Sequence, residues 1–239
     1  MAIGPDRRYM TATQAYAAQI DVGLRQYMMR VYDYMAGGLV LTGLVAFGVA
    51  QSDTLLRAIY GTPLQWVVIF APLAIVLFLG SRVQSMSAGA AQATFWVFAA
   101  AMGLSLSYIF VAYTHASIAR VFFVTAGTFA GMSLYGYTTK RDLSAMGSFL
   151  IMGVWGIILA LIVNIFLKSA ALDFALSIIG VLVFTGLTAF DTQRIKEWYS
   201  EVDGSDVMAK KAIMGALRLY LDFINLFTFL LRFMGASRN

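Results

Sequence analysis

Cysteine is absent from the 239-residue sequence, and histidine occurs only once, at His115. The first absence excludes disulfides and thiolate metal sites, and the second excludes a metal centre built from several histidines of one chain. Charged residues are also scarce, at 12% of the chain, whereas a soluble domain carries about 25%. Apolar residues supply 60% of the sequence. The chain is therefore predicted to be an integral membrane protein, with the lipid bilayer as its surroundings.

The N-terminal residues 1–27 are polar to mildly amphipathic and contain no short apolar core before a small-residue cleavage site. A secretory signal peptide is not expected there, so the first membrane span should act as the insertion signal. Residues 1–27 are predicted to form a cytoplasmic N-terminal segment, and residues 28–239 a transmembrane domain.

Seven stretches are long and apolar enough to cross a bilayer as helices, which takes about 17 to 25 residues each. Their connectors are short, which predicts one compact bundle without a soluble domain. The predicted fold class is an all-α integral membrane protein with a bundle of seven transmembrane helices. The stretches are residues 31–51, 64–81, 88–113, 118–137, 144–167, 174–193 and 212–234.

Lysine and arginine are distributed unevenly between the two sides of these spans. With the N-terminus in the cytoplasm, eleven fall on the cytoplasmic side and five on the opposite side, which by the positive-inside rule predicts that orientation and an external C-terminus. A re-entrant last segment, with six spans and both ends inside, is the alternative. The net charge of +5 follows this loop asymmetry and does not indicate a nucleic-acid partner. The cytoplasmic group is Arg7, Arg8, Arg25, Arg30, Arg82, Lys140, Arg141, Arg194, Lys196, Lys210 and Lys211.

Small residues recur at a spacing that favours close helix packing. Gly127 and Gly131 form a GxxxG pair, and Gly103 and Ser107 form a similar small-residue pair. Such pairs let two helix backbones approach closely. We expect these contacts within one chain rather than between two copies.

Asp222 lies about ten residues inside the last apolar stretch. An ionised aspartate at a helix centre costs about 2.5 to 3.5 kcal/mol, so an acid at this depth should be paired, protonated or part of an ion or proton path. Asp191, near the end of the preceding stretch, is the candidate partner. In an antiparallel hairpin turning at residues 203–206, with Gly204 as a helix C-cap, both acids lie at similar depth, roughly 18 to 24 Å from the turn.

Polar residues extend the faces that carry the two acids. Thr188 precedes Asp191 on one helical face, and Arg218 and Asn225 share a face with Asp222 on the other helix. Two facing carboxyl groups in a low-dielectric environment tend to share one proton and titrate as a unit. When ionised, they also offer oxygen ligands to a hard cation such as Ca²⁺.

Three arrangements of these acids are compatible with the sequence. The aspartates can form a proton-sensing pair, or Arg218 can neutralise Asp222 one turn away in a buried salt bridge. In the third arrangement the acids act separately, with Asp191 beside Arg194 and Lys196. Arg82, at the end of the second span, either extends to the interface or reaches inward as a counter-ion or gate.

Catalytic signatures are missing from the sequence: it contains no nucleophile with its base, phosphate-binding loop or zinc motif. The chain is not expected to be an enzyme or to need a cofactor.

Two segments surround the acids, GLTAFDTQRIK at residues 186–196 and LYLDFINLF at residues 219–227. Together they resemble the Bax inhibitor family, the transmembrane BAX inhibitor motif proteins, and most closely its bacterial branch. The resemblance implies a seven-helix bundle with the last helix near the centre, acting as a pH-sensitive calcium leak channel. It also implies that Asp191 and Asp222 are the proton-sensing pair and that Arg82 engages them. Arg218 departs from the family pattern, in which a small or neutral residue is usual.

The same resemblance supplies a competing function. Some bacterial relatives behave as partners and substrates of a membrane-anchored ATP-dependent protease, and residues 1–27 would be the handle for it. The sequence thus predicts a calcium leak through the bacterial inner (plasma) membrane, or else a regulator of such a protease that does not transport ions.

Overall fold

A computed structural model describes residues 12–238 of the chain, with side chains from residue 22 onward. Their regular secondary structure is helical, apart from one isolated β-bridge between Tyr113 and Ser237 in the described part of the chain. In chain order the helices are α1 (Ala12–Ala50), α2 (Asp53–Tyr60), α3 (Leu64–Arg82), α4 (Ala88–Leu106), α5 (Ile109–Ala112), α6 (His115–Thr138), α7 (Ser144–Leu167), α8 (Ala170–Glu197) and α9 (Ser205–Met234).

Seven segments of the described chain are long and apolar enough to cross a membrane, which confirms the predicted number and the all-α class. Most predicted boundaries hold to within a few residues. The helix that contains the first span, α1, begins well before the predicted span, and the helix of the last span begins at Ser205. The last span is one continuous helix to Met234, which does not fit the re-entrant alternative.

Serine and threonine side chains fix several helix starts. Ser87, Thr114 and Ser169 each accept a hydrogen bond from the backbone N–H three residues later, at the first turns of α4, α6 and α8. This capping satisfies a backbone donor that would otherwise lack a partner at the helix end. α7 ends at Lys168, whose φ of 50° places it in the left-handed region that terminates helices. Short connectors with polar capping residues therefore separate the long apolar helices.

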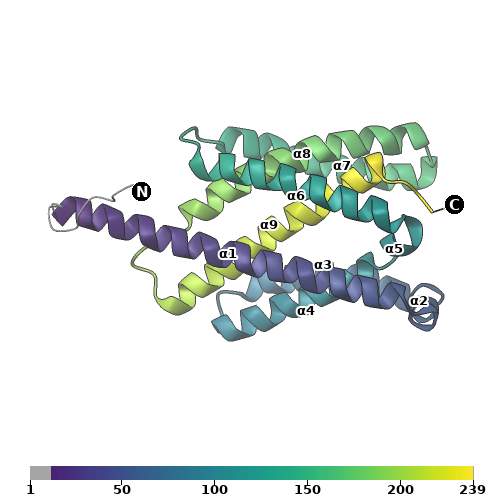
Figure 1. The fold of residues 1–239 in the computed structure, drawn as a ribbon, viewed down its shortest axis with the longest axis horizontal. Coiled ribbons are helices and arrows are strands. Elements are labelled where there is room, and N and C mark those ends of the chain that lie inside the picture. Colours follow the sequence, from purple (N-terminus) through teal and green to yellow (C-terminus); the bar gives the residue numbers. More distant parts are fainter. Residues whose placement is uncertain (1–11, 239) are drawn as a thin grey trace.

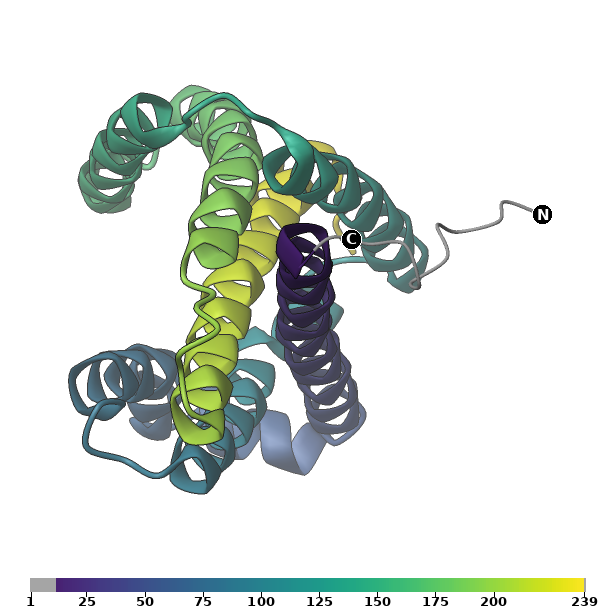
Figure 2. The ribbon, with the colours of Figure 1, turned by 90° about the vertical axis from the view of Figure 1, so that its left-hand side faces the viewer.

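α9 crosses the bundle obliquely between two groups of helices. α6, α7 and α8 lie on one side of it, and α1, α3 and α4 on the other (Figure 1). The view along the bundle places α9 at the centre, as the family resemblance implied (Figure 2). It packs against α1, α4, α6 and α8, and 72% of its most apolar window is buried, compared with 11% for α7. α9 is the core of the fold.

Helices α3 and α7 are peripheral by comparison. α3 packs mainly against α4 and the short α2, and α7 packs mainly against α8. Large apolar side chains therefore face outward from both, including Trp66 and Phe70 on α3 and Trp155 on α7. An outward apolar surface is what a lipid-facing helix needs. α3 therefore has fewer protein neighbours than the helices that pack against α9.

The two small-residue pairs have different surroundings. A Cβ atom on Gly103 would lie 2.8 Å from the backbone oxygen of Thr42, so this glycine permits the close approach of α4 to α1. Gly127 and Gly131 have nothing within 4 Å of the place a Cβ would occupy. The prediction of a close contact within the chain is wrong for this GxxxG pair, because the outer face of α6 that carries it has no neighbouring helix there.

The N-terminal segment predicted over residues 1–27 lies partly outside the described residues. From Ala12 onward the chain already belongs to α1, which continues without a break through the first span to Ala50. This first part of α1 projects beyond the ends of the neighbouring helices (Figure 1). The two ends of the described chain lie at opposite ends of the bundle.

Candidate functional site

Asp191 and Asp222 lie on the two helices that form the centre of the bundle. Asp191 is part of a stretch of α8, Leu187–Gln193, in which every residue is buried, and it is 9% exposed. Asp222 on α9 is 5% exposed, in a similarly buried stretch. The two carboxyl groups act on each other and on Arg218. The structure therefore brings together the two acids that the sequence singled out.

Arg218 pairs with Asp191. Its Nη1 donates a hydrogen bond of 2.9 Å to Asp191 Oδ1, across the interface between α8 and α9. The guanidinium carbon also lies 5.2 Å from the ring centre of Trp198, at the end of α8, a distance typical of a cation–π contact. The Arg218 side chain is 46% exposed, so it connects the buried acids to the bundle end that carries Trp198.

Asp222 has no such partner. Its Oδ2 atom is buried and makes no hydrogen bond to any residue that the structure describes. A buried carboxylate oxygen without a partner is costly. A protonated Asp222 would instead be able to donate to the carboxyl group of Asp191. With one proton, the two acids and Arg218 together carry no net charge, and without it they carry one negative charge.

The acids do not meet through a tight symmetric hairpin. Asp191 lies fewer than two turns before the end of α8, and Asp222 more than four turns after the start of α9. They meet because α9 crosses α8 obliquely, and residues 198–204 bridge the separated helix ends. Gly204 is the N-cap of α9 and not the predicted C-cap of α8, which ends at Trp198.

Thr188 and Asn225 do not join the two acids. Thr188 Oγ1 donates to Phe184 O and Asn225 Nδ2 donates to Leu221 O, each within its own helix at 2.8 Å. These bonds satisfy the polar atoms locally, which is how such residues are accommodated in apolar helices. The predicted supporting seam is therefore not formed by hydrogen bonds between α8 and α9.

A different chain of hydrogen bonds reaches the site. The hydroxyls of Tyr32 on α1 and Ser133 on α6 lie 2.6 Å apart, and Ser133 Oγ lies 3.0 Å from Thr192 Oγ1 on α8, next to Asp191. Sequence reasoning missed this link, because it joins residues far apart along the chain. The link ties three helices together beside the acids.

Arg82 lies at the exposed C-terminal end of α3. Its side chain forms no ion pair or hydrogen bond among the described residues, and the counter-ion of Asp191 is Arg218 instead. The sequence suggested Arg82 and Arg218 as counter-ions of the acids. Only Arg218 lies on α9, which carries Asp222 and packs against the helix of Asp191. Arg82 is thus placed at the interface, as a long basic side chain at a span's end commonly is.

A cavity of about 370 Å³ lies at the same end of the bundle. Val83 and Gln84, just after α3, line one side of it, and Trp198 and Met214 line another. Lys210 and Lys211 also face it, but each is paired with an acid, Asp206 and Asp203 respectively. The cavity therefore approaches Arg218 through Trp198 without an excess of unpaired basic charge in its wall.

The acids do not resemble a resident calcium site. Ca²⁺ takes six to eight oxygen ligands in stable protein sites. No cluster of three or more histidine, cysteine or acidic side chains that could hold a metal occurs among the described residues. Two carboxyl groups, one of them bound by Arg218, supply fewer oxygen ligands than such a site needs.

Comparison with known proteins places the chain in context. Residues 24–239 match the protein family described as "Inhibitor of apoptosis-promoting Bax1". The inner membrane protein YbhL of Escherichia coli (strain K12) is 49% identical over 92% of this chain and 95% of its own length. An uncharacterized protein of Rickettsia prowazekii is 48% identical over 92% of this chain and 93% of its own. An uncharacterized membrane protein of Streptococcus pyogenes is 34% identical over 92% and 96%.

Proposed function

This chain belongs to the Bax inhibitor-1 family, and from that premise we propose that it is a calcium leak channel of a bacterial inner membrane, opened by the loss of one proton. The observation that carries the proposal is the buried Asp222 oxygen without a hydrogen-bond partner, beside Asp191 already bound by Arg218. The N-terminus is proposed to be cytoplasmic, because the basic residues concentrate at that end.

In the closed state, Asp222 keeps its proton and donates it toward Asp191 while Arg218 holds the other side of Asp191. The site is then neutral, and α8 and α9 stay packed. Asp191 and Arg218 are charged side chains that act on Asp222 within the described chain. The proton is therefore the one component of the closed site that a change of pH removes.

Loss of the proton leaves a net negative charge in a buried site. Two carboxylates at close range repel each other strongly where the dielectric constant is low. Water or a cation relieves this repulsion if it reaches the acids, and the cavity next to Trp198 supplies an approach. Residues at the end of α3 form one wall of that cavity, so outward movement of α3 would widen it. The acids then offer oxygen ligands to Ca²⁺ as the transported ion.

Calcium flux into liposomes that contain the purified protein tests this mechanism. We expect greater flux at pH 8 than at pH 6 in the parent protein, and flux without this dependence in Asp222→Asn. Protein that is folded and inserted but passes no Ca²⁺ at either pH would contradict the proposal.

A second candidate function is regulation of a membrane-anchored ATP-dependent protease without transport. The observation that favours it is the start of α1, which projects beyond the ends of the neighbouring helices (Figure 1). A helix presented in this way is accessible to a partner. Deletion of residues 1–21 separates the candidates, because a channel should retain its flux whereas a protease partner should lose recognition.

A further inference from the structure

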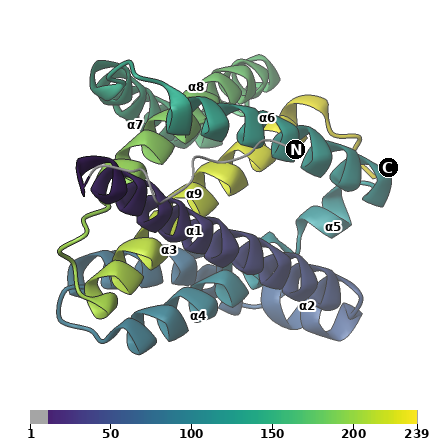
Figure 3. The same cartoon turned by 60° about the vertical axis from the view of Figure 1, so that its left-hand side comes forward.

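A groove runs along the bundle between α1 and α6. Cavities of about 490 Å³ and 540 Å³ lie along it and share Phe129, and both fall in the size range of pockets that hold small molecules. Phe223 of α9 lines the second cavity. α9 is visible between α1 and α6 in the turned view (Figure 3). The groove therefore opens sideways, where the bilayer lies, and its floor is the central helix.

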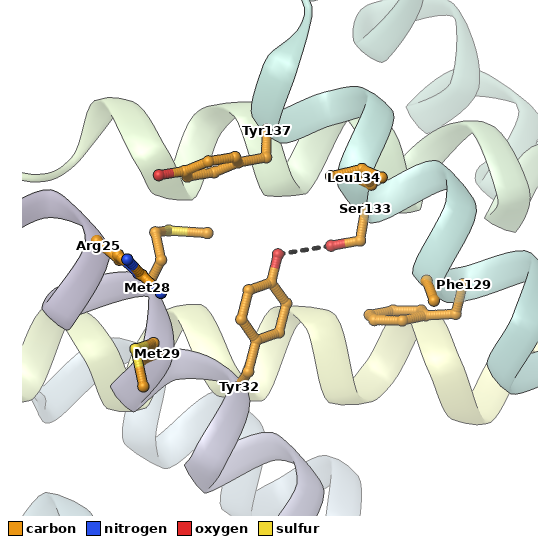
Figure 4. A pocket seen from close by; sticks show the side chains of 9 residues that line it. Arg25, Met28, Met29, Tyr32, Phe129, Ser133, Leu134 and Tyr137 are labelled. Carbon is orange, nitrogen blue, oxygen red and sulfur yellow. Dashed lines mark hydrogen bonds between the residues drawn. The ribbon is translucent and has the colours of Figure 1, made fainter. Parts of the chain in front are cut away.

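The cavity at one end of the groove is mostly apolar but carries one basic and several polar side chains. Arg25, Tyr32 and Tyr137 line the first cavity together with apolar residues such as Met28 and Leu134 (Figure 4). Arg25 is exposed on the N-terminal half of α1, and it lines the same cavity as Tyr137, which lies at the end of α6. Both are thus at the same membrane boundary, where lipid headgroups are found.

A second cation lies close to this end. Lys196 Nζ is 5.6 Å from the centre of the Tyr137 ring and donates to the Tyr137 carbonyl oxygen at 2.7 Å. Arg25 and Lys196 therefore approach the basic end from two different helices. Basic residues at a membrane surface attract anionic lipids by about 1 kcal/mol each.

The rest of the groove is apolar, and the side chains of the described residues do not fill it. Val40 and Leu44 of α1 line the second cavity and remain exposed. Gly43 lies between them, and a Cβ atom there would meet nothing within 4 Å. An elongated apolar slot with a cationic end matches an amphiphile that has an anionic head and a hydrocarbon tail.

We propose that this groove binds one anionic phospholipid, with its headgroup at Arg25 and Tyr137 and one acyl chain along the slot above Phe223. The occupant comes from the leaflet on the N-terminal side. A second copy of the chain fits less well, because the slot ends in exposed basic charge rather than in a self-complementary surface. This binding goes beyond the proposed channel activity and does not depend on it.

Native mass spectrometry of the detergent-purified full chain tests the proposal, with phosphatidylglycerol and phosphatidylcholine of identical acyl chains as probes. We expect the parent to retain one phosphatidylglycerol about fivefold more than phosphatidylcholine, and Arg25→Gln to lose that preference. Arg30→Gln is the matched control, because Arg30 is exposed on the same helix but about 140° around its axis, outside the groove. If Arg25→Gln and Arg30→Gln lowered the preference for phosphatidylglycerol equally, the preference would come from the general surface charge. That result would overturn the proposal.

The slot itself is tested by filling it. Ala130 lines the first cavity and is exposed, so Ala130→Trp occupies the cavity without displacing the core. We expect this variant to lose the bound lipid, while Val124→Trp on the outer surface of α6 keeps it. Retention of the parent's lipid by folded Ala130→Trp would overturn the proposal, as would equal binding of the two phospholipids by the parent. Neither readout involves Ca²⁺ flux.

Discussion

Arg218 binds Asp191 on the neighbouring helix although Asp222 lies one turn away on its own helix. Helical side chains lean toward the N-terminus, so Arg218 leans away from Asp222 and toward the end of the bundle. A basic residue four positions before an acid is also the less favourable order for an ion pair within a helix. The arginine therefore neutralises one acid and leaves the other to depend on a proton.

Asp222→Asn should remove the pH dependence of Ca²⁺ flux. The amide of asparagine can donate to Asp191 at every pH, as the protonated acid does, so flux should stay at the low level of the closed state. Fluxes at pH 6 and pH 8 should then agree. Asp173→Asn is the control, because Asp173 is a half-exposed acid at the other end of α8 and should leave the parent's profile unchanged. A parent-like profile in Asp222→Asn would place the sensor elsewhere.

Asp191→Asn should also flatten the profile, for a different reason. It removes the carboxylate with which Asp222 would share its proton and frees Arg218 from its partner. With a single acid left, loss of a proton creates no repulsion between two carboxylates, so flux should be insensitive to pH while the bundle stays folded. Far-UV circular dichroism checks the fold, and the same liposome assay measures flux.

Arg218→Gln should move the midpoint of the pH profile upward. Without the guanidinium the two acids hold their shared proton more tightly, so a higher pH is needed to remove it. Arg82→Gln is the matched control, because this arginine lies at the same end of the bundle and does not contact the acids. If only Arg82→Gln moved the midpoint, Arg218 would not be the counter-ion that sets the response.

Gly136→Ala should destabilise the bundle by about 1 to 3 kcal/mol. A Cβ atom at this position would collide with the backbone oxygen of Ala189, so α6 would be pushed away from α8 two residues before Asp191. Gly127→Ala, on the open face of the same helix, should be neutral or slightly stabilising. Thermal unfolding of both variants in detergent measures the difference, and equal midpoints would contradict the close contact.

Tyr220→Phe should lower the unfolding free energy by about 1 kcal/mol. Thr42 Oγ1 donates to Ala99 O at 2.8 Å, so the Tyr220 hydroxyl, 2.7 Å away, must donate to Thr42. This buried chain joins α9, α1 and α4. Tyr135→Phe, at an exposed position, should change stability by less than about 0.5 kcal/mol. A comparison of unfolding midpoints tests both expectations.

Local patterns predicted the helices and the two acids, because apolar runs and a misplaced charge are visible along the chain. The partner of Arg218 was not predictable from spacing alone, because the sequence allowed a pair with Asp222 on the same helix or with Asp191 on the neighbouring one. The way α9 packs against α8 decides between these two partners. The contact between Tyr32 and Ser133 and the groove beside it were also hidden. Both depend on how far α1 and α6 stand apart, which is a property of the assembled bundle.

The central position of α9 has a consequence for how the protein is made. This helix leaves the ribosome after the six other spans, yet it is the one on which α1, α4, α6 and α8 converge. Until α9 is inserted, the faces of the earlier helices that will later contact it are therefore exposed to lipid in the bilayer. α9 also carries Arg218 and Asp222, so insertion into lipid alone stabilises it less than packing against the helices inserted before it. A premature stop within this last helix would leave six inserted helices without a common core, a natural target for membrane quality control.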